Sequence, residues 1–307
     1  LSPPCDLLVA QGRILATAPV DKTRGAGKTI DGGGNLVMQG LVNAHFHDSV
    51  NHMKGRLPSL PLELFMLYES PALDRLRPTP REAYLRTMLG CIEMLRTGTT
   101  TVGDDCFFVP EPTPEVIADA GMRARPALDE PEQAETEKLP FLAELAPLGL
   151  MPRLSARPRL TGEDLITLYR EVIARWHGAE QGRLKVAVSC SAPQRVTAEY
   201  MAALDDLSRS HDLPFYAHML ETRLQRVLGQ ERFGGRSLGR LTDERGARSE
   251  RMLVIHAIWV DDTDLDLIAA RGAVVAHNPI SNLRLGSGVM PFRAMRDRGI
   301  PVCLGTD

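Results

Sequence analysis

Short apolar runs alternate with helical stretches along most of the chain, and this alternation constrains the fold more than any other feature. Eight runs have the composition of buried strands: residues 36–42, 99–103, 123–128, 184–189, 214–218, 252–256, 273–277 and 300–305. Stretches predicted as helices lie between them, such as 81–96, 162–176 and 198–209. Such a repeat indicates parallel strands joined by helices. Eight strands would close a (β/α)₈ barrel, although a doubly wound open sheet alternates in the same way.

Two regions depart from this alternation. Near the start, residues 6–10 and 12–15 are predicted to pair as a short hairpin, and the glycine-rich sequence at 31–35 is predicted to form a turn. Residues 131–160 are rich in proline and glutamate and are predicted to form a loop or a broken helix.

Composition excludes several classes of partner. The formal net charge is −3, which gives no electrostatic basis for binding nucleic acid or an anionic membrane. The five cysteines are scattered and include no CxxC pair, which favours reduced thiols in the cytoplasm over a disulfide framework. No apolar run reaches the ~20 residues of a membrane helix, and no signal segment opens the chain. We therefore expect a soluble cytoplasmic protein.

Histidines gather where the predicted strands end. Five of the eight occupy such positions: His45, His47, His218, His256 and His277. In a barrel, the carboxyl ends of the strands form the face that carries active sites. One histidine there is more often structural, but five on one face indicate a functional site. The remaining three, His52, His177 and His211, lie in loop or helix contexts, where a structural role is expected.

His45 and His47 form an HxH pair directly after the first apolar run. Residues i and i+2 of a strand point to the same side, so both imidazoles are expected to face the barrel interior. Imidazole ligands suit zinc and Fe(II). The pair alone is a common pattern, and its position at a strand end is what makes it informative.

Two carboxylates occupy comparable positions. Glu221 follows His218 by three residues, which would let one segment both bind a metal and transfer a proton; a helix-terminal carboxylate is the alternative. Asp307 ends the last apolar run and could bind the metal and accept a proton from water. The alternative for Asp307 is a cap on a following helix.

Taken in order, these segments resemble the amidohydrolase superfamily, in the branch with guanine, cytosine and adenosine-type deaminases and triazine hydrolases. The motifs are LVNAHFH (41–47), GTTT (98–101), SAPQ (191–194), AHMLET (217–222), VIH (254–256), HNPISN (277–282) and LGTD (304–307). The resemblance covers nearly the whole chain and implies a (β/α)₈ barrel over residues 39–307. Residues 1–38 would then contribute to a small β-sandwich.

The resemblance also implies roles for individual residues. Four match the metal ligands: His45, His47, His218 and Asp307. Glu221 matches the proton shuttle, and His256 matches the residue that polarises the substrate, so the catalytic residues would be Glu221, His256 and Asp307. Three further residues are expected to contact substrate: Gln194, His277 and Asn282.

The number of metal ions follows from the fourth predicted strand. Binuclear members of the superfamily carry a modified lysine at the end of this strand, whereas here the strand ends in Ser189 and its lysine, Lys185, lies at the opposite end. We therefore expect one divalent metal, with zinc preferred and Fe(II) as the alternative.

The predicted function is an aminohydrolase that deaminates a nitrogen heterocycle such as a purine, pyrimidine or pterin. A hydroxide generated at the metal would attack the ring carbon, and ammonia would leave. The alternatives are the same machinery with another leaving group, as in triazine or cyclic amide hydrolysis, and an inactive metal-binding scaffold. The other zinc deaminase fold needs P-C-x-x-C, which is absent from the sequence. The expected partner is a small heterocycle, and a homodimer stays open.

Two departures from the family pattern and one specificity segment complete the expectations. Gln39 stands where this branch has proline, which we expect to be a mild change. The sequence stops at Asp307, whereas the family continues with a final helix and sandwich strands, so we expect that C-terminal part to be missing here. Residues 53–70 are expected to form much of the pocket wall. Met66, Tyr68 and Glu69 could line a flat heteroaromatic pocket, but an amphipathic helix packing on the barrel rim is the preferred interpretation.

Overall fold

The computed structural model describes residues 3–19, 27–55, 59–66, 78–106, 113–130, 132–138, 144, 148–156, 158, 160–244 and 249–307. The chain divides into two compact units, Leu1–Gln39 and Gly40–Asp307. Within the described residues, no helix is both long and apolar enough to span a bilayer.

The first unit contains an antiparallel hairpin of β1 (Cys5–Ala10) and β2 (Arg13–Pro19). Its turn residues, Gln11 and Gly12, have φ of 50° and 71°, and two successive positive values are the geometry of a two-residue hairpin turn. A second turn is closed where the amide of Asn35 donates to the carbonyl of Gly32. Both features match the sequence prediction.

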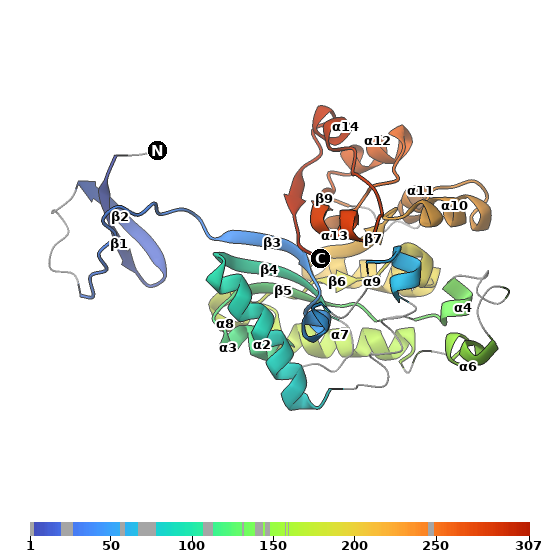
Figure 1. Ribbon diagram of the computed structural model, residues 1–307, viewed down its shortest axis with the longest axis horizontal. Coiled ribbons are helices and arrows are strands. Elements are labelled where there is room, and N and C mark those ends of the chain that lie inside the picture. Colours follow the sequence, from blue (N-terminus) through green and yellow to red (C-terminus); the bar gives the residue numbers. More distant parts are fainter. Residues whose placement is uncertain are drawn as a thin grey trace. The chain divides into compact units, whose positions relative to one another are not determined.

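The second unit contains eight parallel strands among its described residues (Figure 1). They are β3 (Leu41–Phe46), β4 (Thr99–Cys106), β5 (Arg123–Leu128), β6 (Val188–Ser189), β7 (Phe215–Met219), β8 (Met252–His256), β9 (Val274–His277) and β10 (Val302–Leu304). Seven of the eight predicted runs contain a strand at the predicted place.

The first strand begins later than predicted. The sequence suggested a strand over residues 36–42, but β3 starts at Leu41 and continues through His45. The neighbouring strand supplies the reason: the amide of Leu41 pairs with the carbonyl of Gly98, and β4 begins only at Thr99. Before Leu41 the described chain has no strand beside it with which to pair.

Hydrogen bonds join the two groups of strands into a closed ring. The ladders connect β3–β4–β5 and, separately, β6–β7–β8–β9–β10. Between β5 and the chain just before β6, the amide of Lys185 donates to the carbonyl of Ala124 at 3.0 Å. Between β3 and the residues that follow β10, the amides of Thr306 and Asp307 donate to the carbonyl of His45 at 3.1 and 2.9 Å. The second unit is therefore a (β/α)₈ barrel, in which the carboxyl ends of all strands meet on one face.

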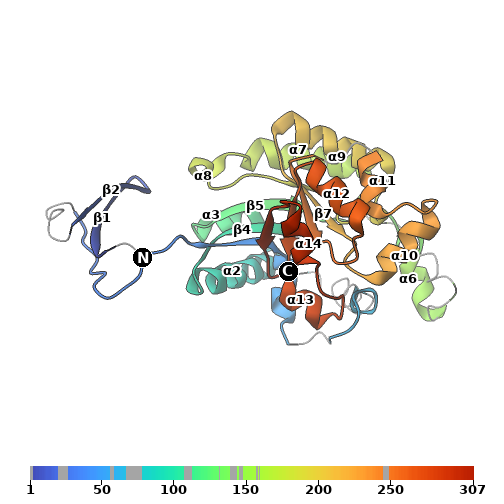
Figure 2. The same cartoon turned by 90° about the horizontal axis from the view of Figure 1, so that it is seen from above.

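Helices follow the strands and surround them, with α7 and α9 along one side and α2 along another (Figure 2). The longer ones are α2 (Pro80–Arg96), α3 (Thr113–Asp119), α7 (Gly162–Trp176), α9 (Ala198–His211), α10 (Arg223–Arg232), α11 (Leu238–Glu244), α12 (Asp262–Ala270), α13 (Pro279–Arg284) and α14 (Phe292–Asp297). Thr79, Thr161 and Asp261 start α2, α7 and α12 with reciprocal capping boxes.

Short helical turns occupy the described parts of residues 131–160, which the sequence predicted to be a loop or a broken helix. They are α4 (Glu135–Lys138), η2 (Leu148–Leu150) and α6 (Met151–Leu154). Two more turns, η1 (Asp48–Met53) and η3 (Pro193–Arg195), follow β3 and β6 on the face where the strands end.

Candidate metal centre and pocket

The histidines of β3 supply the first two imidazoles of the centre. His45 is fully buried, and the next residue but one, His47, is largely buried. Their ring centroids lie 4.6 Å apart. Both rings point to the barrel axis because alternate residues of a strand share a face. Their Nε2 atoms lie 3.0 and 3.3 Å from the same oxygen, Oδ1 of Asp307.

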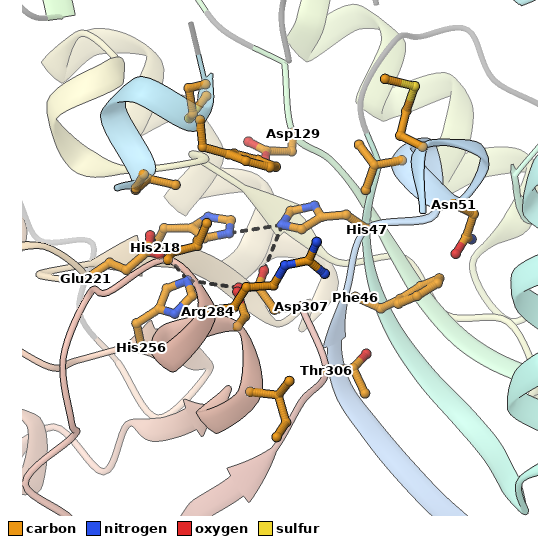
Figure 3. Close-up of a pocket in the computed structure, with 18 of the residues that line it drawn as sticks. Phe46, His47, Asn51, Asp129, His218, Glu221, His256, Arg284, Thr306 and Asp307 are labelled. Atoms are coloured by element: carbon orange, nitrogen blue, oxygen red, sulfur yellow. Dashed lines mark hydrogen bonds and ion pairs between the residues drawn. The ribbon is translucent and has the colours of Figure 1, made fainter. Parts of the chain in front are cut away.

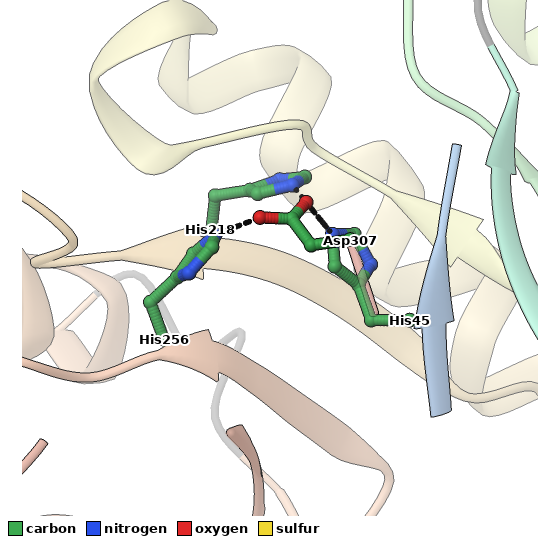
Figure 4. Close-up of side chains that lie close together, drawn as sticks. All are labelled: His45, His218, His256 and Asp307. Atoms are coloured by element: carbon green, nitrogen blue, oxygen red, sulfur yellow. Dashed lines mark hydrogen bonds and ion pairs between the residues drawn. The ribbon is translucent and has the colours of Figure 1, made fainter. Parts of the chain in front are cut away.

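His218, near the end of β7, completes the group from across the barrel. Its Nε2 lies 3.2 Å from Nε2 of His45 and 3.4 Å from Nε2 of His47. Figure 4 shows the ring of His218 and the carboxylate of Asp307 turned toward His45. Four donor atoms from three strand ends therefore converge on one point.

The donor atoms fit a metal ion in both spacing and chemistry. A tetrahedral zinc ion with bonds of about 2.0–2.1 Å holds its ligand atoms about 3.3 Å apart, and four of the six separations between the donor atoms here run from 3.0 to 3.4 Å. Nδ1 of His47 donates to the carbonyl of Asp105, and Nδ1 of His218 donates to the carbonyl of Ser191, each at 2.8 Å. These bonds leave the Nε2 lone pairs directed at the centre.

The charges of the group also favour a cation. Burial lowers the pKa of His45 to about 4 and holds the pKa of His218 well below its usual value, so both imidazoles are neutral at pH 7. Burial also lowers the pKa of His47, but the hydrogen bond and charge of Asp307 outweigh that effect and raise it to about 10, so a bound metal would have to replace a proton on the ring of His47. Burial opposes ionisation of Asp307, yet the nearby histidines keep its pKa well below the usual range. The carboxylate thus provides negative charge for a bound ion.

Glu221 and His256 lie beside this group. His256 ends β8, and its Nε2 lies 3.5 Å from Oε2 of Glu221 and 3.8 Å from Oδ2 of Asp307. Glu221 follows β7, and its backbone amide donates to the side chain of Gln225. Burial raises the pKa of Glu221 to about 7, with the charge of His256 opposing the shift and that of Asp307 adding to it. A carboxyl group whose pKa lies near 7 can both donate and accept a proton at neutral pH.

A second layer of buried carboxylates lies behind the histidines. Asp104 and Asp105 end β4, and Asp129 follows β5. Burial raises the pKa of Asp104 and of Asp105, and neighbouring aspartates add to both shifts. Oδ2 of Asp105 accepts a hydrogen bond from Ser189 at 3.2 Å, while its backbone carbonyl holds His47. These aspartates are not among the site residues predicted from the sequence, although they lie at strand ends, the same feature that singles out the histidines.

The metal centre forms the floor of a cavity of about 500 Å³ (Figure 3). Its wall includes many apolar side chains, among them Phe46, Met53, Leu62, Phe65, Met66, Leu154, Leu228, Ile280 and Leu285. Three cationic residues, Lys54, Arg195 and Arg284, also line it. This size and composition are typical of a small-molecule site.

The cavity contains some, but not all, of the residues predicted to contact substrate. Gln194 lines it, whereas His277 and Asn282 do not. Asn282 is fully buried, and its Oδ1 accepts a hydrogen bond from Nδ1 of His256 at 2.8 Å, so it contacts a neighbour of the centre. Lys185 is exposed, and His52, His177 and His211 are also exposed and do not line the cavity.

The segment predicted to form the pocket wall does so in its described parts. Residues 53–55 and 62–63 line the cavity, as do Phe65 and Met66. Tyr68 and Glu69, the other two residues suggested for the pocket, lie outside the described residues.

Comparison with known proteins identifies the family to which the chain belongs. The Amidohydrolase family model matches residues 36–307. The chain is 30% identical to a 5'-deoxyadenosine deaminase of Methanosarcina mazei and 32% identical to a 5-methylthioadenosine/S-adenosylhomocysteine deaminase of Nitratidesulfovibrio vulgaris, covering 98% of this chain and 63% of each relative. The chain belongs to the amidohydrolase family. It spans a little under two thirds of the length of these relatives.

Solved structures agree on the fold. An adenosine deaminase of Xanthomonas campestris with bound zinc superimposes with a TM-score of 0.78 at 24% identity, covering 99% of this chain and 64% of that one. An atrazine chlorohydrolase of Arthrobacter aurescens complexed with zinc superimposes with a TM-score of 0.84 at 22% identity, covering 98% of this chain and 67% of that one. Both neighbours hold zinc. In this chain, the donor set described above supports a divalent metal at the site.

Proposed function

We propose that this protein is a hydrolytic deaminase that removes an amino group from a nitrogen heterocycle and releases ammonia. One observation carries the proposal: three imidazole nitrogens and the Asp307 carboxylate converge within 3.0–3.4 Å, directly beside the buried pair Glu221 and His256. A scaffold that only binds metal has no use for a buried glutamate with a pKa near 7 at this place.

His45, His47, His218 and Asp307 would hold one ion, for which zinc is our choice because the donor spacings of 3.0–3.4 Å match tetrahedral zinc. The ion would lower the pKa of water to about 7 and so supply the nucleophile at neutral pH. We propose a single ion because the fourth barrel strand, β6, ends at Ser189 and not at a lysine, and the nearby Lys185 is exposed.

The residues around the centre divide the proton transfers between them. Asp307 accepts a proton from the attacking water. Glu221, protonated below its pKa of about 7, delivers a proton to the ring nitrogen next to the attacked carbon. His256 hydrogen-bonds the oxygen of the resulting tetrahedral carbon, and Asn282 orients its ring. The apolar wall of the cavity would exclude water and receive the flat ring.

The relatives favour an adenosine-type substrate, since the two quoted above are named for 5'-deoxyadenosine and for 5-methylthioadenosine and S-adenosylhomocysteine. The chlorohydrolase neighbour favours a second candidate, in which the same machinery expels another leaving group from a triazine. Pocket shape chooses between them, because the metal-side chemistry is common to both.

Ammonia release from a substrate panel tests the proposal. We would load the full-length protein with zinc and measure initial rates with 5'-deoxyadenosine, 5'-methylthioadenosine, guanine, a pterin, cytosine and melamine, with atrazine scored by chloride release. We expect turnover of at least one aminated ring. Turnover of atrazine alone would establish the second candidate, and no turnover of any substrate by the zinc-loaded protein would contradict both.

We further propose that the protein acts in the cytoplasm on a small molecule, without nucleic acid or membrane, and as a homodimer. The five cysteines are free thiols, three of them buried, which supports a reducing compartment. Sedimentation of the full-length protein tests the dimer.

A further inference from the structure

Asp129 is a buried carboxylate beside the metal centre that the proposed chemistry leaves without a role. Its side chain is 1% exposed, and within the described residues neither carboxylate oxygen has a hydrogen-bond partner. A buried carboxylate without hydrogen-bond donors carries a desolvation penalty, which the interaction of Asp129 with the ring of His47 offsets only in part. Such a group points to a donor that arrives with the ligand.

The backbone holds Asp129 firmly in this place. Its amide donates to the carbonyl of Cys106 at 2.7 Å, which extends the β4–β5 ladder by one residue. The hydroxyl of Tyr169 binds both the amide and the carbonyl of the preceding residue, Leu128. The carboxylate lines the cavity and lies next to His47 and His218, as Figure 3 shows.

A second metal ion does not explain Asp129. A carboxylate oxygen of Asp129 and ring nitrogens of His47 and His218 lie within 4.8 Å of one another. However, the Nδ1 atoms of both histidines are taken by backbone carbonyls. Each Nε2 has one lone pair, and both are directed at the site shared with His45 and Asp307. Asp129 therefore has no second ion to bind and is left to interact with a molecule that binds at the metal centre.

The chemistry of the carboxylate restricts what it can bind. The neighbouring wall residue Gln194 also has a buried side-chain oxygen without a partner, but an amide can turn to present either a donor or an acceptor. Asp105 has Ser189 as its donor. Asp129 presents two acceptor oxygens to the cavity, which attract N–H groups and repel chloride or alkoxide.

We infer that Asp129 accepts hydrogen bonds from the departing amino group and selects amines over other leaving groups. This inference rests on the proposed function and names its leaving group. When the tetrahedral carbon collapses, the C–N bond breaks and both electrons stay on nitrogen. Asp307 returns to that nitrogen the proton it took from water, and the hydroxyl proton restores Glu221 as the C=O bond forms. Asp129 takes no net proton; its oxygens orient the N–H bonds of the ammonia that leaves.

A matched pair of substrates tests this assignment. Adenosine and 6-chloropurine riboside share ring and sugar and differ in the leaving group, so we would compare kcat/KM for both with zinc-loaded wild type and Asp129→Asn. We expect adenosine turnover to fall about 10²-fold, the loss typical of removing one hydrogen bond directed at a transition state. Chloride release should stay the same or rise, because the variant no longer places a negative charge beside the departing anion. Metal content, measured by elemental analysis, should stay at the wild-type level.

The ratio of the two rates separates this role from a structural one, because damaged folding lowers both rates together. Asp205→Asn is the control, since Asp205 is also buried but pairs with Arg209 on α9, away from the cavity; its ratio should match wild type. Equal losses on both substrates, an unchanged adenosine rate, or loss of the metal would each overturn the assignment. If wild type turns over neither riboside, the ratio is taken with whichever aminated ring the panel identified and its chloro analogue. Failure of the whole panel would instead contradict the proposed function.

Discussion

Left-handed backbone conformations recur at residues that end strands around the metal centre. Ser191, Leu220 and His256 have φ of 56°, 52° and 74°, values that non-glycine residues rarely adopt. Each turns the chain sharply where a strand stops. The carbonyl of Ser191 thereby reaches Nδ1 of His218. This local strain is the kind that surrounding packing maintains at functional sites.

The role of Glu221 gives a prediction at this scale. Glu221→Gln removes the exchangeable proton but keeps the shape, so we expect turnover to fall by roughly 10² or more with the metal retained. In the wild type, a raised pKa keeps Glu221 protonated up to about pH 7, and kcat should therefore decline as pH rises through that value. Rates across pH 5–9 and elemental analysis measure both effects. Near-normal turnover of the glutamine variant would return Glu221 to a structural role.

Tyr169 on α7 joins two strands that have little direct pairing. Its hydroxyl accepts hydrogen bonds from the amides of Leu128 and Ser189 and donates to the carbonyl of Leu128, at 2.9–3.0 Å. Because β6 has only two residues, a helix side chain supplies part of the connection between β5 and β6. The positions of Asp129 and of the β6 loop thus depend on a helix on the outside of the barrel.

We expect Tyr169→Phe to destabilise the protein by about 1–3 kcal/mol, since it leaves buried backbone groups without a partner. Urea unfolding measures the change. Tyr84→Phe is the control, because its hydroxyl binds Asp119 at the surface, and it should cost less than about 0.5 kcal/mol. Equal costs for the two variants would contradict a special role for Tyr169.

Gly305 permits the close contact that closes the ring between β10 and β3. A Cβ atom at this position would lie 2.4 Å from Oδ1 of Asn278 and 2.9 Å from the backbone N and O of His45. Gly305→Ala should therefore push Asp307 away from His45. We expect it to lower the free energy of unfolding by about 1–3 kcal/mol and to weaken metal binding. Gly149→Ala, where a Cβ would meet nothing within 4 Å, is the control. Zinc titration of both variants measures the effect, and wild-type affinity in Gly305→Ala would refute it.

At the scale of the whole molecule, the metal centre links distant parts of the barrel. Its candidate ligands come from β3 and the residue after it, from β7, and from Asp307, three residues past the end of β10. A bound ion would therefore connect the neighbouring strands β3 and β10 to β7 on the opposite side of the barrel. The binding energy of an ion held only by the folded state adds to stability.

Removing the metal should therefore lower the melting temperature of the full-length protein, and zinc should restore it. We expect about one equivalent of metal in wild type, none in His45→Ala, and a normal content in His52→Ala, because His52 is exposed and does not line the cavity. Elemental analysis and calorimetry measure these quantities. Two tightly bound equivalents would show that the argument from Ser189 and Lys185 for a single ion is wrong.

The sequence determined the elements because periodicity and caps act locally. It predicted α7 at its observed bounds and seven strands in place, and family resemblance identified a binding face where strands end. Its one displaced strand, 36–42, shows the limit: strand length depends on the partner, and β4 is available only from Thr99.

Tertiary structure alone decided which polar residues meet. Nothing local distinguishes Asp105, whose oxygen has Ser189 as a donor, from Asp129, whose oxygens have none among the described residues. Similarly, only the tertiary structure shows that Asn282, which was predicted to contact substrate, accepts a hydrogen bond from His256. Hydrogen bonds between residues far apart in the chain depend on the relative placement of several strands, and that placement results from packing of the whole barrel, which no single segment encodes.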